Sequence, residues 1–244
     1  MEKNLIYKKI MHELQNQILD GEYQETMKLP DERTLSQTFG VSRSSIKRAL
    51  KLLADKGAVF QKRGSGTFIN PIFVKNDSVF HYKNGSNLGI SDSFQMNGQS
   101  PQIKLLSFNV ERCPKELATD LFIKDTDFVY AFKRLRSFDD QSFMIETGYI
   151  PIKILPQLEE KTLTESLFKY VEQVKKQGVT KSYLTIGVSP STEEDRTELN
   201  LLSTEPVGTL SGIFFLDDGT PFEYSQMRLR YDYMNYHTFV SLED

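Results

Sequence analysis

The stretch that decides the fold runs from residue 29 to residue 68 and reads LPDERTLSQTFGVSRSSIKRALKLLADKGAVFQKRGSGTF. Its first part predicts a short helix over residues 31–38, for which Asp31 is a suitable N-cap. After a glycine, Ser42 is a suitable N-cap for a longer helix over residues 43–55. The pattern therefore predicts two helices that are joined by a tight turn.

The predicted helix over residues 43–55 has one apolar face and one basic face. Its apolar residues recur at helical spacing, as expected for a side that faces a core: Ile46, Ala49, Leu50, Leu53 and Ala54. The other positions carry cations and hydroxyls: Arg43, Ser44, Ser45, Lys47, Arg48 and Lys51. Arginine can pair with guanine, serine can reach bases or phosphates, and lysine neutralises phosphate. A solvated helix face is the alternative for this helix taken alone, but its neighbours favour a helix that enters the major groove of DNA.

A hairpin is predicted directly after this helix. Residues 58–61 and 67–69 can pair as strands around Lys62 to Gly66, where two glycines permit a tight turn. Two cations at the tip, Lys62 and Arg63, suit a wing that lies against the DNA backbone or in the minor groove. Upstream, Ile6, Ile10, Leu14 and Ile18 recur every four residues and predict a further amphipathic helix. The first 71 residues thus predict a winged helix-turn-helix.

Charge divides the 244-residue chain into two parts. Residues 1–71 carry a net charge of +4 and the remainder carries −7, so only the first part is expected to meet a polyanion. The single cysteine, Cys113, excludes a disulfide within the chain and fits a reducing compartment. The chain has neither a membrane-length apolar stretch nor a secretory signal, so we expect a cytoplasmic protein that has no membrane partner.

The remainder of the chain is rich in predicted strands. They fall at residues 104–110, 128–138, 142–150, 182–188, 207–216 and 221–230, with turn sequences at 137–140 and 217–220 that predict two hairpins. Helices are predicted at 91–97, 114–121, 162–176 and 192–199. Antiparallel strands with helices packed to one side make an α+β domain. We expect a linker over residues 72–87, between a domain at 1–71 and a domain at 88–244.

Residues 29–70 resemble the DNA-binding domain of the GntR family of bacterial transcription regulators. The resemblance rests on Leu29 to Arg33, on Val41 to Leu50 and on Gly64 to Ile69, which match three motifs of that family. It implies DNA contacts from six residues: Arg33, Ser42, Arg43, Ser45, Lys47 and Gly64. Arg48 joins this set as a further cation of the same helix.

The part of the chain from about residue 80 to 240 resembles the UTRA ligand-sensing domain of the HutC-type subfamily. The resemblance rests on Arg134 to Arg136, on Glu146 before Tyr149 to Pro151, and on Pro221 to Tyr224 followed by Arg230 to Asp232. It implies an antiparallel sheet with flanking helices, similar to chorismate lyase. It also implies dimerisation and a small bound metabolite, often a phosphosugar.

The residues themselves also indicate an effector site. Arg134 and Arg136 lie two apart on a predicted strand, share one face and can clamp a phosphate or carboxylate. The alternative for them is a solvated strand face or ion pairs with acidic neighbours. Glu146 and Glu223 can accept hydrogen bonds from sugar hydroxyls, with surface or cross-strand salt bridges as the alternative. The family pattern adds Ser91 and Ser166 at helix starts, where free N–H groups help to bind an anion.

Catalytic and metal-binding patterns are not found in the sequence. The three histidines are scattered, and there is no nucleophile elbow, Walker loop or dinucleotide fingerprint, so we expect neither a cofactor nor a metal. The favoured hypothesis is a metabolite-responsive regulator, expected to be a repressor, that binds an inverted-repeat operator as a homodimer. Two alternatives are an enzyme that acts on an anionic substrate and an architectural DNA-binding protein that has no effector.

Overall fold

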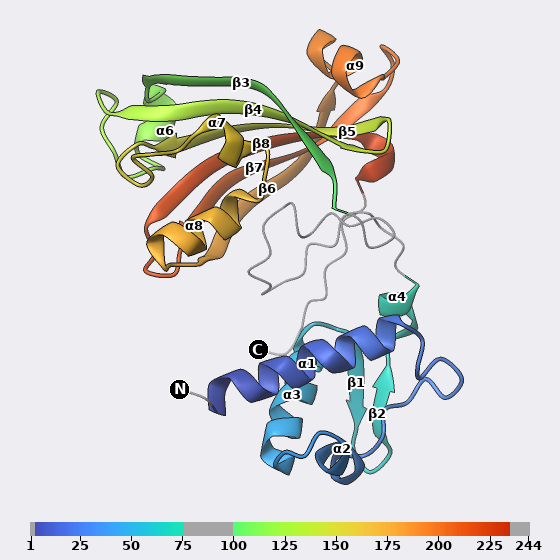
Figure 1. Ribbon diagram of the computed structural model, residues 1–244. Coiled ribbons are helices and arrows are strands. Elements are labelled where there is room, and N and C mark those ends of the chain that lie inside the picture. Colours follow the sequence, from blue (N-terminus) through green and yellow to red (C-terminus); the bar gives the residue numbers. More distant parts are fainter. Residues whose placement is uncertain (1–2, 76–99, 235–244) are drawn as a thin grey trace. The chain divides into compact units, whose positions relative to one another are not determined.

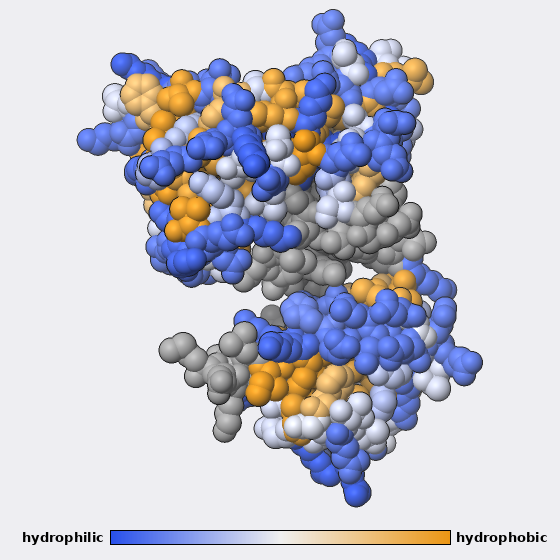
Figure 2. Space-filling model, viewed as in Figure 1, coloured by the Kyte–Doolittle hydropathy of each residue, from blue (hydrophilic) through white to orange (hydrophobic). Residues whose placement is uncertain are grey.

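The computed structural model describes residues 3–75 and 100–234 (Figure 1). These residues form two compact units, and each is described by itself. We call residues 3–75 the head and residues 100–234 the body. In Figure 2, polar side chains cover most of the visible surface of each unit, with smaller apolar patches among them.

The head is a winged helix-turn-helix, as the sequence predicts. Its elements are α1 (Lys3–Leu19), α2 (Glu32–Thr38), α3 (Arg43–Asp55), β1 (Val59–Lys62), β2 (Gly66–Ile69) and α4 (Pro71–Val74). Helix α1 buries Leu14 and Ile18, and they pack in one cluster with Ile46, Leu50 and Leu53 of α3. The apolar stripe of α3 is therefore the side that faces the core, and the opposite side is left for solvent or a partner.

Both helices of the motif begin at the predicted caps. The Asp31 carboxylate accepts a hydrogen bond from the Thr34 N–H at 2.8 Å, at the start of α2. The Ser42 hydroxyl accepts one from the Ser45 N–H at 3.3 Å, at the start of α3. Each cap satisfies a backbone donor that the first turn of a helix leaves without an internal partner.

Two features of the head lie outside the predicted elements. Met27 to Leu29 run beside β2, where the Leu29 N–H donates to the Thr67 carbonyl and the Ile69 N–H donates to the Met27 carbonyl, both at 2.9 Å. Helix α4 lies at the start of the predicted linker and is capped by the side chain of Asn70. Most of the predicted linker lies outside the described residues.

The body is built on one six-stranded antiparallel sheet. Its strands are β3 (Gln102–Arg112), β4 (Phe128–Phe138), β5 (Gln141–Pro151), β6 (Val179–Pro190), β7 (Pro206–Leu216) and β8 (Pro221–Arg230). They lie in the order β3-β4-β5-β8-β7-β6, and both predicted hairpins are present, as β4–β5 and β7–β8. Together with the head, this sheet confirms the predicted α+β fold class.

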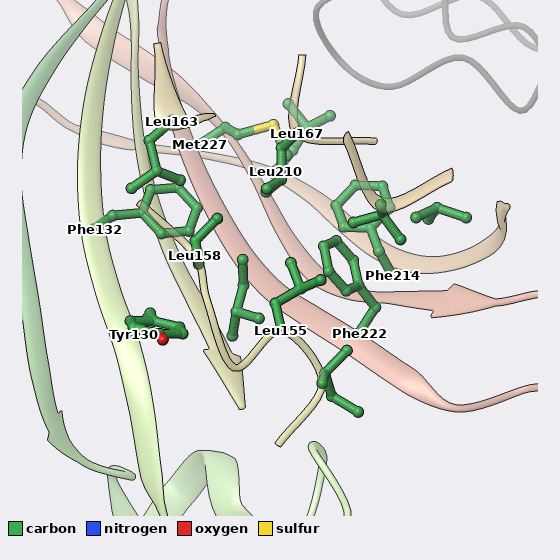
Figure 3. Close-up of a cluster of buried hydrophobic side chains, with 14 of the residues drawn as sticks. Tyr130, Phe132, Leu155, Leu158, Leu163, Leu167, Leu210, Phe214, Phe222 and Met227 are labelled. Atoms are coloured by element: carbon green, nitrogen blue, oxygen red, sulfur yellow. The ribbon is translucent and has the colours of Figure 1, made fainter. Parts of the chain in front are cut away.

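Helices cover both faces of the sheet, so the expectation that they pack to one side is wrong. On one face, Tyr130 and Phe132 pack with Leu163 of α7 (Glu160–Leu163) and Leu167 of α8 (Leu167–Lys175), as Figure 3 shows. On the other face, Val129 packs with residues of α6 (Lys115–Ala118). Further along that second face, residues of β4 and β5 pack with α9 (Glu193–Leu199). Adjacent residues of β4 point to opposite faces, which is why one strand serves both clusters.

The predicted helices of the body differ from the observed ones in two places. The single helix predicted over residues 162–176 is divided into α7 and α8, because Ser166 has an extended backbone with φ −74° and ψ 103°. The helix predicted over residues 91–97 lies outside the described residues. Within the described ranges, every helix is too short or too polar to cross a membrane.

Candidate functional sites

The exposed side of the helix-turn-helix gathers most of the predicted DNA contacts. Arg33 of α2 and Arg43 and Lys47 of α3 are exposed, and Ser42 lies at the start of α3. Arg33 and Arg43 lie in the first turns of their helices, where the free N–H groups add a partial positive charge, and Lys47 follows one turn after Arg43. This arrangement is suited to a polyanionic partner.

Local contacts separate the cations of α3 into different environments. The Lys47 ammonium lies 3.9 Å from the Glu32 carboxylate, and both side chains are well exposed. The Arg48 guanidinium lies over the ring of Tyr7 in α1, at 6.0 Å from its centroid. Arg48 is thus directed toward α1, whereas Arg43 belongs to the first turn of α3. The assignment of all these residues to DNA contacts stays a prediction.

The hydroxyls at the start of α3 form a small network. The Ser42 oxygen lies 2.8 Å from that of Ser44 and 3.0 Å from that of Ser45. Ser42 therefore has a structural role as a cap in addition to its predicted role at DNA.

The wing ends in an open backbone turn. Gly64 has φ +72°, and a Cβ added at this position would meet no atom within 4 Å. The left-handed backbone accounts for glycine here without reference to a ligand. The absence of neighbours leaves the peptide group accessible, which agrees with its predicted contact to DNA.

In the body, two arginines and a glutamate of the predicted effector site meet in a buried cluster. Arg134 on β4 stands opposite Glu146 on β5, and its guanidinium reaches Glu146 Oε2 from Nη2 at 2.8 Å and from Nε at 3.0 Å. Arg136 donates to the same oxygen at 2.9 Å. All three residues are at most 2% exposed. The ion pair that was the alternative for these arginines is therefore present, and it is enclosed in the core.

The guanidinium of Arg134 rests on an aromatic ring. It lies 4.8 Å from the ring centroid of Phe132, which is on the same face of β4. The ring occupies the space above Gly148, where an added Cβ would collide with the ring carbons of Phe132. Arg134 also donates to the Leu163 carbonyl at 3.3 Å, at the end of α7. Phe132, Gly148 and Leu163 thus position Arg134, although the sequence reasoning did not single them out.

Glu223 on β8 is the second buried carboxyl group of this region. Burial and the nearby charge of Glu146 raise its pKa to about 8. Burial alone would also raise the pKa of Glu146, but Arg134 and Arg136 outweigh that effect and hold it at about 2. At neutral pH the cluster therefore contains two cations, one carboxylate and one neutral carboxyl group.

Two oxygens of predicted effector residues have no hydrogen-bond partner in the described structure. They are Oε1 of Glu223 and Oγ of Ser166, and both atoms are buried. Ser166 precedes α8, and its hydroxyl does not cap that helix. Ser225, which the sequence reasoning missed, donates to Glu146 Oε1 at 3.3 Å. Ser91, the sixth predicted effector residue, lies outside the described residues.

A separate hollow of about 540 Å³ lies at one end of the body sheet. It is lined by Val110, Phe128 and Ile152 and their neighbours, at the ends of β3, β4 and β5. The arginine cluster lies in the middle of the strands and contributes nothing to this hollow. Among the described residues, no group of three His, Cys, Asp or Glu side chains is placed to hold a metal ion.

The exposed basic helix-turn-helix is the architecture of a DNA-binding regulator, and it is joined to a second, sheet-based unit. Comparison with known proteins agrees. Residues 6–69 match the model of the bacterial regulatory proteins of the gntR family, and residues 96–235 match that of the UTRA domain. The chain belongs to the GntR family of transcriptional regulators and carries a UTRA domain, which is the architecture of the HutC subfamily.

Individual relatives match along most of the chain. It is 30% identical over 226 residues to the HTH-type transcriptional regulator GmuR of Bacillus subtilis (strain 168), covering 93% of this chain and 94% of that protein. It is 28% identical to the mannosyl-D-glycerate transport/metabolism system repressor MngR of Escherichia coli (strain K12), covering 91% and 90%. The crystal structure of a possible transcriptional regulator, YydK from Bacillus subtilis, superposes with a TM-score of 0.78 at 28% identity, covering 97% and 99%. These relatives are regulators, which confirms that the chain is not an enzyme.

Proposed function

We propose that this regulator is a repressor that binds an inverted-repeat operator as a homodimer and is released by a small anionic sugar derivative. The effector would bind at the cluster of Arg134, Arg136, Glu146 and Glu223 in the body. Pairs of helix-turn-helix heads match the two half-sites of a palindrome, which supports the dimer. The cytoplasm is the compartment in which such a protein would meet both DNA and metabolites.

The buried pair of guanidiniums is the observation that carries the proposal. Arg134 and Arg136 direct their guanidiniums at a single oxygen of Glu146 on one face of the sheet. Guanidiniums bind phosphates and carboxylates through paired hydrogen bonds, so two of them side by side are suited to an anionic ligand.

The two buried polar atoms without partners support a ligand that also carries hydroxyl groups. Glu223 Oε1 and Ser166 Oγ each lack a hydrogen bond, and buried polar groups of folded proteins seldom do. A sugar offers several hydroxyls at once. The relative MngR, whose name refers to mannosyl-D-glycerate, agrees with a sugar derivative that carries an acid group.

The enclosed position of the cluster supports a coupling between effector and structure. Arg134 is tied to the end of α7 through the Leu163 carbonyl, and the chain between α7 and α8 contains Ser166. A ligand that takes over the arginines would compete with these contacts, so it would favour a different arrangement of α7 and α8. Such a differential interaction is what allows an effector to shift a conformational equilibrium.

The DNA-binding part is tested with operator sequences selected from random duplex DNA by the wild-type protein. Arg43→Ala should lower affinity for the selected sequence by about ten- to a hundredfold, as expected for loss of a base contact. Binding that is unchanged by Arg43→Ala would rule out this residue as a base contact. A protein that selects no sequence at all would contradict a sequence-specific regulator and favour an architectural role.

The effector part is tested by thermal unfolding with a panel of sugar phosphates. A ligand should raise the Tm of the wild-type protein and should lower its operator affinity. Arg134→Lys should lose the shift, whereas Lys133→Gln should keep it because Lys133 lies on the opposite face of β4 and pairs with Glu194. An equal shift in all three proteins would place the ligand elsewhere.

The domain boundaries belong to the same proposal. We propose a DNA-binding domain at residues 1–71, a linker at 72–87 and an effector-binding and dimerisation domain at 88–244. The helix α4 lies at the junction of the first two segments.

A further inference from the structure

A lysine outside the predicted DNA-contacting set lies on the wing. Lys28 lies in the segment that runs beside β2, and it forms an isolated antiparallel backbone β-bridge with Phe68. The backbone bonds of its neighbours Met27 and Leu29 to β2 hold this segment in register. Lys28 is therefore part of the wing, although it stands more than thirty positions earlier in the sequence.

The side chain of Lys28 is directed along β2 toward the wing tip. Its ammonium lies 5.4 Å from the ring centroid of Phe68, as in a cation–π contact. Gly66, the first residue of β2, has no side chain, and a Cβ added there would lie only 2.8 Å from the Cε of Lys28. Gly66 thus leaves the space that the lysine occupies, and the ammonium is brought next to the turn that holds Arg63 and Gly64.

The contacts of Lys28 leave its charge available. Lys28 is exposed, and within the described parts of the chain it forms no ion pair with a carboxylate. Phe68 restricts the side chain without neutralising it, so less freedom is lost when a partner binds. A held, exposed cation beside the cations of the turn is suited to an anionic backbone.

We propose that Lys28 is a phosphate-contacting residue of the wing, held over Phe68 and beside Gly66, and that it contributes to DNA affinity without reading sequence. This inference rests on the proposed DNA binding of the head. Lysine neutralises a phosphate as a point charge, and such a contact positions the protein on the duplex. Together with Lys62 and Arg63, it would make the wing a three-cation contact to the DNA backbone.

The experiment compares the salt dependence of DNA binding for full-length wild-type, Lys28→Gln, Lys28→Arg and Lys9→Gln proteins. The probes are the selected operator and a scrambled duplex of the same length. Lys9→Gln is the matched control, because it removes one exposed charge from α1, outside the wing. Thermal unfolding of each variant in the absence of DNA verifies that the head is intact.

Lys28→Gln should bind about three- to tenfold more weakly near physiological salt and should reduce the slope of log affinity against log salt by about 0.9. The loss should be the same on both duplexes, and Lys28→Arg should restore binding. Equal slopes for the wild type and Lys28→Gln would overturn the inference, as would equal losses in Lys28→Gln and Lys9→Gln. Wild-type protein that binds neither duplex would overturn the proposed function as well.

Discussion

The head and the body differ in how exposed their functional arginines are. In the head, Arg33 and Arg43 are exposed on short helices whose other side is the core. In the body, Arg134 and Arg136 are buried on β4, an interior strand of the sheet, and both form ion pairs with Glu146. One unit offers charge to a large partner, and the other encloses charge within its core.

The difference indicates where each unit obtains specificity. Exposed cations attract any polyanion, so the head depends on the placement of a few side chains on α3. A buried cluster admits only a ligand that can replace the interactions it displaces. Because the charged cluster of the body is buried, mutations of its residues should lower stability much more than mutations of the exposed cations of the head.

The largest effect is expected from Glu146→Ala. It leaves two buried guanidiniums without their shared carboxylate, so the body should lose about 3–5 kcal/mol of unfolding free energy. Urea unfolding followed by circular dichroism measures this change. The matched control is Glu194→Ala, which breaks the ion pair between Glu194 and Lys133. The side chains of Lys133 and Glu194 are 29% and 47% exposed, so this variant should lose less than about 1 kcal/mol of unfolding free energy. Similar costs for the two variants would contradict the comparison.

The second effect concerns pH and Glu223. Its pKa is about 8 in the folded protein and 4.5 in its unperturbed form, so between these values the folded state keeps a proton that the unfolded state has lost. The stabilisation from this group is complete below pH 4.5 and is lost as pH rises through about 8, with a slope of about 1.4 kcal/mol per pH unit.

Glu223→Gln should remove that slope, because the amide stays neutral at every pH. The measurement is urea unfolding of both proteins between pH 5 and 8. Glu146 stays ionised between pH 5 and 8, because its pKa in the folded protein is about 2. Its own contribution to stability is lost only in acid, as the pH falls below about 4.5. The same pH dependence in both proteins would show that Glu223 is ionised in the folded state.

The smallest effect on stability is expected at Ser42, where capping and DNA binding can be separated. Ser42→Ala should cost about 1 kcal/mol through loss of the cap of α3. Ser42→Asp keeps a capping oxygen and should preserve stability, yet its negative charge should weaken DNA binding if the residue faces phosphate. Thermal unfolding and operator titration give the two readings. Normal DNA binding by Ser42→Asp would leave this residue with the structural role alone.

Most of the head could be predicted from sequence because its determinants are local. The predicted helix over residues 43–55 has the observed bounds of α3, and Asp31 and Ser42 act as the predicted caps. Lys28 was missed because its neighbour in the wing, Phe68, is remote in sequence.

In the body, the strands were predictable but their partners were less so. Spacing placed Arg134 and Arg136 on one face, but counting outward from the turn at Asp139 and Asp140 would have placed Ile145 opposite Arg134. The register shift between Arg136 and Ser137 brings Glu146 there instead. The approach of Ser225 to the cluster depends on the pairing of β5 with β8, which no local pattern encodes. The division between α7 and α8 has no glycine or proline to mark it.

The order of the strands has a consequence for folding. The sheet consists of two three-stranded meanders, β3-β4-β5 and β6-β7-β8, and each can form from consecutive segments. Their strands are hydrogen-bonded to each other where β5 pairs with β8, a contact that closes a long loop and is entropically costly to form. The arginines and Glu146 belong to the first meander, while Glu223 and Ser225 belong to the second. The complete cluster therefore exists only after the two meanders have joined, so the binding site that we propose for the effector cannot be complete in a nascent chain until β8 has been synthesised.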